Sequence, residues 1–144
     1  MAGYAESQLI TNRVSVLLCG GAEADRKAWA QEACAAFADE GALIEASTAA
    51  AFNQALSLRA GVVYVADASQ LSWATQGELT RLLREREERP KFIFGLNASP
   101  AAAAQRGLLR EDLFFALSKS TVDLSAAEVK ESISSRRKKS KKAR

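Results

Sequence analysis

The chain has 144 residues, which is enough for one domain with a substantial hydrophobic core. Hydrophobic residues make up 48% of it and charged residues 26%, the balance of an ordinary globular domain. Its apolar runs are too short to cross a bilayer and its amino end lacks a cleavable signal, so we expect a cytoplasmic protein without a membrane span. Because it has no histidine and no clustered cysteines, we predict no metal site. Cys19 and Cys34 are expected to be reduced and buried.

The net charge of +3 is unevenly distributed along the chain. Residues 136–144 carry seven Lys or Arg and no acid, which leaves 13 basic against 17 acidic residues elsewhere, a net of −4. A dense run of like charge cannot bury anything, so residues 133–144 are predicted to form a disordered basic tail. The tail either binds nucleic acid without reading its sequence or only keeps the protein soluble. Its candidate contacts are Arg136, Arg137, Lys138, Lys139, Lys141, Lys142 and Arg144.

Apolar runs alternate with amphipathic segments between a polar lead-in (residues 1–12) and the tail. The lead-in ends in a short predicted helix. Strands are predicted at 13–19, 42–45, 61–66, 91–96 and 121–124, and helices at 24–38, 48–58, between 67 and 90, and at 109–117. This alternation is typical of a parallel α/β sheet with a site at its carboxyl edge, formed here by a single domain over residues 13–132. We expect substantial burial of Trp29, Phe37, Leu79, Leu83, Phe92 and Phe94.

Three stretches, in chain order, carry a family resemblance. They are A-G-V-V-Y-V-A-D-A-S-Q-L-S-W-A-T-Q-G-E-L-T-R-L-L-R-E from Ala60, I-F-G-L-N from Ile93 and L-R-E-D-L-F-F-A-L-S from Leu109. These resemble G-G-T-L-F-L-D-E-I-G-E-L-P-L-x-L-Q-A-K-L-L-R-V-L-Q-E, I-A-A-T-N and F-R-E-D-L-Y-Y-R-L-N of the ATPase domain of sigma-54-dependent transcription activators, a branch of the AAA+ P-loop proteins. The resemblance implies a three-layer α/β fold of the P-loop NTPase (AAA+) type. Its parallel five-stranded sheet would have helices on both faces and the strand order fifth, first, fourth, third, second.

The phosphate loop that the resemblance implies is altered. The family pattern is G-E-S-G-T-G-K-E, and residues 20–27 read G-G-A-E-A-D-R-K. Glu23 and Asp25 replace two glycines, and carboxylates at these positions would repel phosphate. Arg26 stands at the position of the family's lysine, with Lys27 one step away. We therefore favour an ordinary strand-to-helix turn over a working nucleotide cradle.

The strand tips that the family uses for magnesium and phosphate have also changed. Ala66 replaces the aspartate of the family's magnesium-binding pair, and Asp67 replaces its glutamate. Asn97 matches the family's sensor asparagine, although it also suits a turn before Pro100. If a vestigial nucleotide site persists, its residues are Gly20, Gly21, Arg26, Lys27, Asp67 and Asn97.

Arg110 matches the first of two arginines that family members present to a neighbouring subunit's nucleotide, and Ala116 stands at the second position. Arg110 alternatively pairs with Glu111 or Asp112 on a helix surface. The family's G-A-F-T-G-A loop, which touches the sigma factor, has no counterpart between Phe37 and residue 61. After residue 124 the family's helical lid and helix-turn-helix are missing.

We therefore predict a degenerate AAA+ domain without catalytic residues, which acts as a regulatory or interaction module in transcription regulation or signalling. A protein partner is expected, and a homo-oligomer is one form of it. One alternative is a weak ATP-binding domain of a transcription activator, with ATP and Mg²⁺ as the only cofactors considered. Another is a receiver-like signalling domain, less favoured because the first strand ends in Cys19-Gly20-Gly21 rather than in an acidic pair.

Overall fold

The computed structural model describes the backbone of residues 3–142 and the side chains of residues 3–139. Five parallel strands form one sheet in the order β2-β3-β4-β1-β5. They are β1 (Val16–Cys19), β2 (Ile44–Glu45), β3 (Val62–Val65), β4 (Lys91–Gly95) and β5 (Thr121–Asp123). The predicted fold class and strand order are confirmed.

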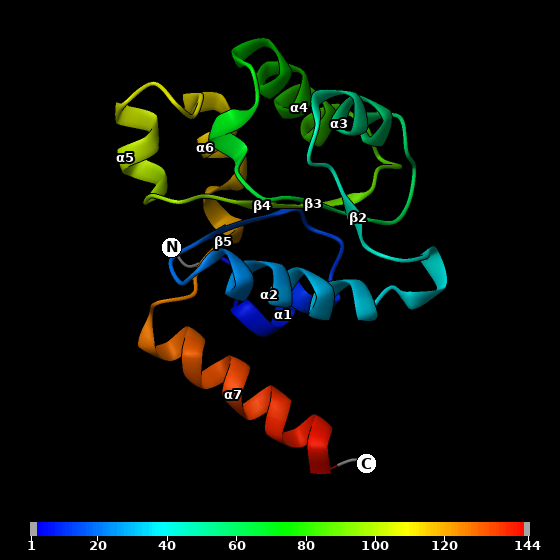
Figure 1. Ribbon diagram of the computed structural model, residues 1–144, viewed down its shortest axis with the longest axis vertical. Helices are drawn as coiled ribbons and strands as arrows, with labels where there is room; N and C mark the ends of the chain where they lie inside the picture. The colour runs from blue at the N-terminus through cyan, green and yellow to red at the C-terminus, as the bar shows by residue number, and fades with distance from the viewer. Residues whose placement is uncertain (1–2, 143–144) are drawn as a thin grey trace.

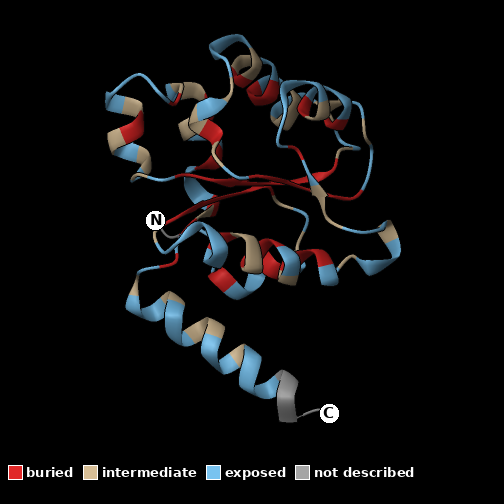
Figure 2. Cartoon of the chain, in the orientation of Figure 1, coloured by how far each residue is buried: buried red, intermediate tan, exposed pale blue. Residues whose placement is uncertain are grey.

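Helices cover both faces of the sheet and make three layers (Figure 1). They are α1 (Glu6–Thr11), α2 (Glu23–Ala35), α3 (Ala49–Leu56), α4 (Trp73–Glu85), α5 (Pro100–Gln105), α6 (Glu111–Leu117) and α7 (Ala127–Lys142). Helices α3 to α6 lie on one face, and α1, α2 and α7 lie on the other. The sheet between them is buried on both sides, as Figure 2 shows, which explains why its central strands are continuous apolar runs.

Most of the predicted core positions are fully buried. No surface is exposed on Trp29, Leu79, Phe92 and Phe94. Leu83 and Phe37 are only half-buried, at the margins of the two clusters that flank the sheet. Phe37 follows the end of α2, and its ring centroid lies 5.1 Å from the guanidinium carbon of Arg13, so a charged side chain covers it rather than the sheet.

The prediction of a disordered tail is wrong for the described part of residues 133–144, because α7 continues to Lys142. Val129 and Ile133 pack against the apolar cluster beneath the sheet, and Arg136 is half-buried one turn further on. These positions are spaced by four and three, so they form a helical stripe within the basic sequence. Among the predicted contacts, the side chains of Lys141 and Lys142 are not described, and Arg144 lies outside the described residues altogether.

The lead-in belongs to the same layer as α7. Leu9 and Ile10 of α1 are buried in the cluster beneath the sheet, where α1 contacts both α2 and α7. Cys19 and Cys34 are buried free thiols. Over the range that the structure describes, no helix combines the length and the apolar character that crossing a membrane requires.

Candidate functional site

The carboxyl edge of the sheet brings together segments that are far apart in the sequence. β4 lies between β1 and β3, so the turn after β1 and the tips of β3 and β4 are neighbours. Gly20 and Gly21 form the turn, Asp67 follows β3 and Asn97 follows β4. This edge is where open α/β sheets bind their ligands.

The turn after β1 depends on its two glycines. Gly20 has φ +71° and Gly21 has φ +64°, values that other residues rarely adopt. A Cβ atom on Gly20 would also lie 2.1 Å from Oδ1 of Asp123. Oδ2 of Asp25 accepts a 2.8 Å hydrogen bond from the amide of Ala22 and so caps the start of α2. The Asp25 carboxylate, which would repel phosphate, is therefore hydrogen-bonded to an amide of the turn itself.

Arg26 occupies the centre of this edge. Its side chain is buried, and Nη1 donates to the carbonyl oxygens of Gly20 at 3.1 Å and Gly21 at 3.0 Å. Nη2 donates to Oδ1 of Asn97 at 2.5 Å. Among the described residues, Nε of Arg26 finds no acceptor. The Arg26 side chain thus connects the turn with the tip of β4 through hydrogen bonds. It also satisfies two carbonyl groups of the turn that would otherwise be unpaired.

The polar contacts continue from Asn97 to the tip of β3. Nδ2 of Asn97 donates to Oδ2 of Asp67 at 3.3 Å. The other oxygen of Asp67 accepts from the amide of Ser69 at 3.0 Å and from its hydroxyl at 2.6 Å. Asp67 therefore caps the short turn Ala68–Gln70, the role of a strand-end carboxylate.

Gly95 also shapes this site, although it was not among the residues predicted from the sequence. A Cβ atom there would lie 2.4 Å from the carbonyl oxygen of Ala66 and 3.4 Å from Nε of Arg26. A glycine at the end of β4 is therefore what lets the Arg26 side chain and the tip of β3 approach the strand. Glycine inside a strand pattern is the signal that marks such a close approach.

Lys27 does not join the site. Its Nζ lies 2.8 Å from Oε1 of Glu45, and this partner raises the pKa of Lys27. The ion pair is exposed and joins α2 to β2 on the outside of the molecule.

Arg110 is held on a different surface, between α4 and α6. Nε and Nη2 donate to the two carboxylate oxygens of Asp112 at 2.9 and 3.0 Å, and Nη1 donates to the carbonyl oxygen of Trp73 at 3.2 Å. The hydrogen bond from Arg110 lowers the pKa of Asp112. The guanidinium carbon also lies 5.5 Å from the Trp73 ring centroid. Pairing with Asp112, one of the two predicted alternatives, is what this structure contains.

The residues at the carboxyl edge do not fit a nucleotide with magnesium. A phosphate loop presents amide groups and a free cation, whereas this turn presents carbonyl oxygens to a buried guanidinium. Ala66 supplies no side-chain oxygen, and both oxygens of Asp67 already accept hydrogen bonds. We therefore derive no chemical step through ATP or Mg²⁺.

The basic stretch is partly used within the fold. Arg136 donates from Nη1 to Oε1 of Glu6 at 2.6 Å and from Nε to Oε2 of Glu32 at 2.7 Å. Arg137 lies 3.4 Å from Glu32, while Lys138 and Lys139 are exposed. Burial alone would raise the pKa of Glu6, but hydrogen bonds from Arg136, Ser132 and Trp29 outweigh it and leave this pKa below its ordinary value. These contacts form the clamp that holds α7 against α1 and α2.

The parallel sheet and its strand order define a domain with the P-loop NTPase-type fold. The sigma-54 interaction domain is the family whose model matches, over residues 11–126, and the chain belongs to this family. The match leaves no support for a receiver-like domain. No curated protein matches the chain.

Solved structures show the same fold. The P-loop NTPase domain of the sigma-54 transport activator from E. coli has a TM-score of 0.66 and 17% identity, over 76% of this chain and 95% of that one. NtrX from Brucella abortus in complex with ATP has a TM-score of 0.63 and 16% identity, over 85% of this chain and 38% of that one. NtrX with ADP has a TM-score of 0.63 and 17% identity, over 85% and 37%. The chain thus spans well under half of NtrX.

Proposed function

We propose that this chain is a non-catalytic interaction module of transcription regulation, which keeps the fold of an activator ATPase and does not turn over ATP. The observation that carries the proposal is the position of Arg26, which bonds both carbonyl groups of the loop and the sensor-like Asn97. In a phosphate-binding loop, phosphate oxygens of the bound nucleotide occupy this space. A guanidinium stays charged at every physiological pH, so nucleotide entry would require breaking all three hydrogen bonds.

The absence of a magnesium ligand at Ala66 supports the same proposal. Phosphoryl transfer depends on metal ions and cations that neutralise charge on the phosphates. Asp67 is the one remaining acid of the family's pair, and it is engaged with Ser69 and Asn97. A carboxylate used as a cap is poorly placed to polarise water.

A protein contact is supported by the surface over α4 and α6. Of the four large apolar side chains that are exposed in the described chain, three lie on this side: Trp73 at 52%, Leu108 at 44% and Phe115 at 69%. Exposed aromatic residues beside an arginine are typical of protein interfaces. Arg110, stacked on Trp73, remains our candidate for a contact with another subunit. We place the module in the cytoplasm, where Cys19 and Cys34 would stay reduced as they are here.

Sedimentation equilibrium tests the interface. We expect the wild-type chain to self-associate, and Trp73→Ser to shift it toward monomer. Lys139→Ser is the control, because Lys139 is exposed on α7, which lies on the opposite face of the sheet from α4 and α6. A monomeric wild type would exclude the homo-oligomer and leave a different protein as the partner. Equal association of wild type and Trp73→Ser would show that the contact lies elsewhere.

A weak ATP-binding domain is the second candidate. The specific observation in its favour is that Gly20, Asp67 and Asn97 still meet at one edge of the sheet. NtrX, which shares the fold, has been solved with ATP and with ADP. Two measurements separate the candidates: we expect no phosphate release from Mg-ATP above background and no saturable nucleotide binding by titration calorimetry. Micromolar affinity without phosphate release would favour the second candidate. Release that requires Mg²⁺ and is lost in Asp67→Ala would overturn the proposal.

A further inference from the structure

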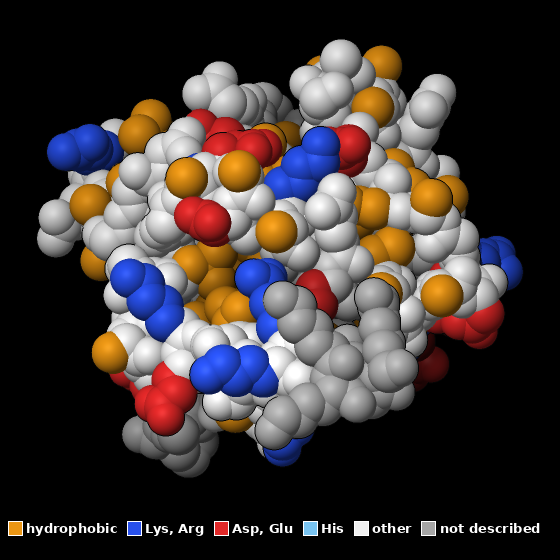
Figure 3. Space-filling model, turned by 60° about the horizontal axis from the view of Figure 1, so that its bottom comes forward, with side chains coloured by type: hydrophobic (Ala, Val, Ile, Leu, Met, Phe, Trp, Pro, Cys, Tyr) orange, Lys and Arg blue, Asp and Glu red, His pale blue; other side chains and the backbone are white. Residues whose placement is uncertain are grey.

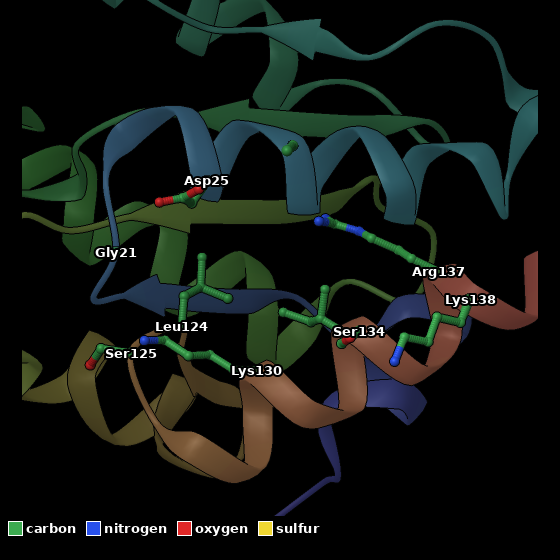
Figure 4. A pocket seen from close by; sticks show the side chains of 10 residues that line it. Gly21, Asp25, Leu124, Ser125, Lys130, Ser134, Arg137 and Lys138 are labelled. Carbon is green, nitrogen blue, oxygen red and sulfur yellow. The ribbon is translucent and has the colours of Figure 1, made fainter. Parts of the chain in front are cut away.

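A cavity lies away from Arg26, between α2 and α7 (Figure 4). Its volume is about 590 Å³, within the range of pockets that hold small organic ligands. Gly21 and Asp25 link it with the loop described above, but neither Arg26 nor Asn97 lines it. The residues that would contact a ligand in this cavity are therefore different from those at the carboxyl edge.

The floor of this cavity is apolar. Ala28 of α2, Leu124 after β5 and Ile133 of α7 contribute to it. The space-filling view shows a hollow with a hydrophobic floor and basic side chains around it (Figure 3). Contact of this apolar floor with water is unfavourable in free energy, and an apolar ligand that covers the floor would remove that contact.

The rim on the α7 side is basic. Lys130, Ser134 and Lys138 recur every four residues, so they lie along one face of the helix and line the cavity. Neither lysine forms an ion pair within the described residues. Figure 4 shows them at opposite ends of the α7 wall. Eight residues of helix span about 12 Å, a distance that two flexible lysine side chains can close around one anionic group.

The remaining charges of the rim are already engaged. Arg137 lies 3.4 Å from Glu32. Asp25 accepts a hydrogen bond from the amide of Ala22 but keeps its negative charge, and because it lies on the α2 side it directs an anion toward the α7 side of the cavity. The two lysines and the hydroxyl of Ser134 are therefore the groups left to meet a ligand. Their charge complements an anion and gives a neutral ligand no advantage.

We propose that the cavity binds a small organic anion with an apolar body, a carboxylate, sulfonate or phosphate whose charged group lies between Lys130 and Lys138. The apolar body rests on Leu124 and Ile133. An inorganic anion would leave this floor exposed to water, and a neutral apolar molecule would leave the lysines unpaired.

The test uses 1-anilinonaphthalene-8-sulfonate as probe, with N-phenyl-1-naphthylamine as its uncharged counterpart. In the full chain we expect one saturable site for the sulfonate with a Kd on the order of 10–100 μM. The double variant Lys130→Met/Lys138→Met should weaken the sulfonate at least tenfold and leave the uncharged dye unchanged. Lys139→Met, which removes an exposed charge outside the cavity, is the matched control and should bind as wild type. Equal sulfonate affinity in the double variant and wild type would overturn the proposal.

Filling the cavity gives an independent check. Ala28→Phe projects a ring from α2 into the floor, and we expect it to abolish binding of both dyes while the urea midpoint stays within the wild-type range. Dye binding retained by this folded variant would also overturn the proposal. Competition by phenyl phosphate and by benzoate then distinguishes a phosphate from a carboxylate ligand. Inorganic phosphate should not compete, and equal competition by it would contradict the need for an apolar body.

Discussion

The guanidinium of Arg26 and the side-chain oxygen of Asn97 are joined by a 2.5 Å hydrogen bond between α2 and the tip of β4. The side-chain amide of Asn97 in turn donates a hydrogen bond to Asp67 at the tip of β3. Polar side chains of the protein therefore occupy the crevice that α/β sheets of this kind offer to a ligand. We propose that this internal polar network stands in place of a ligand site.

Arg26 should stabilise the fold. Arg26→Met leaves two loop carbonyl groups and Asn97 without their donor, and we expect a loss of about 2–4 kcal/mol in the free energy of unfolding. Urea denaturation measures it. Lys27→Met, the next residue on the same helix, removes only an exposed ion pair and should unfold near the wild-type midpoint. Similar midpoints for Arg26→Met and Lys27→Met would show that the network contributes little.

The clamp of α7 should depend on Arg136. In Arg136→Met, Glu6 remains buried without its cationic partner, which costs about 3 kcal/mol and should free α7 for cleavage by trypsin. Arg137→Met, whose side chain is 51% exposed, is the control and should leave α7 protected. Equal cleavage rates in the two variants would mean that the apolar contacts of Val129 and Ile133 hold the helix alone.

The pH dependence of the clamp follows from Glu6. The pKa of this carboxyl lies below its ordinary value of 4.5, so the folded state favours the charged form. The stabilisation is complete above pH 4.5 and is lost as the pH falls through the lower, folded-state pKa. Urea midpoints of wild type should therefore fall over this range more steeply than those of Glu6→Gln. Parallel curves would contradict the assignment.

Lys91 should make stability rise with pH. Its side chain is fully buried, and Nζ donates to the carbonyl oxygens of Asn12 at 2.8 Å and Val14 at 2.6 Å. Burial, with a smaller effect of Arg13, lowers the pKa of Lys91 from 10.5 to about 7. Between these values the unfolded chain binds the extra proton, so the free energy of unfolding increases with pH, by at most about 1.4 kcal/mol per unit. Lys91→Met should flatten the curve between pH 7 and 10, and an unchanged slope would refute this.

Nucleic-acid binding, if present, should come from the chain beyond the clamp. Arg136 and Arg137 are engaged by acids, so Lys138 and Lys139 are the described candidates for phosphate contacts. Lys141, Lys142 and Arg144, whose side chains are not described, remain candidates from the sequence. We expect weak binding indifferent to sequence, with about three to five phosphate contacts and a slope of about −0.9 per contact in log affinity against log salt. Gel-shift titration of the full chain against a version ending at Arg137 keeps the clamp intact. Equal affinity of the two would limit the basic stretch to a structural role.

The sheet was predictable because its information is local. The runs around Val16, Val62 and Phe92 are continuously apolar since they are buried on both faces, and Trp29 and Leu79 lie on helical faces of the expected period. The strand order came from the resemblance to the family, because periodicity does not determine which strands are neighbours. The burial of Phe37 was overestimated, since the apolar spacing of the sequence continues past the residue where α2 ends.

Several residues that meet at the carboxyl edge could be predicted from the sequence, but Gly95 was missed, Lys27 lies outside this edge, and the contacts could not be predicted. Gly20, Arg26, Asp67 and Asn97 were identified from motif positions, yet nothing in the sequence shows that Arg26 turns onto the loop carbonyl groups. The helix α7 was missed for a related reason. Charge density argued for disorder, whereas the ion pairs with Glu6 and Glu32 join residues more than a hundred positions apart, which no local pattern records.

A titration of ¹⁵N-labelled protein with Mg-ATP, followed by NMR, tests the central claim most directly. The amide of Gly20, the side-chain amide of Asn97 and the Nε–H of Arg26 report on the crevice, and none of these residues lines the cavity between α2 and α7. With Arg26 bonded to the loop and to Asn97, we predict that these three signals stay unchanged up to millimolar Mg-ATP. Saturable shifts of all three would show that the nucleotide displaces Arg26, and would contradict the account.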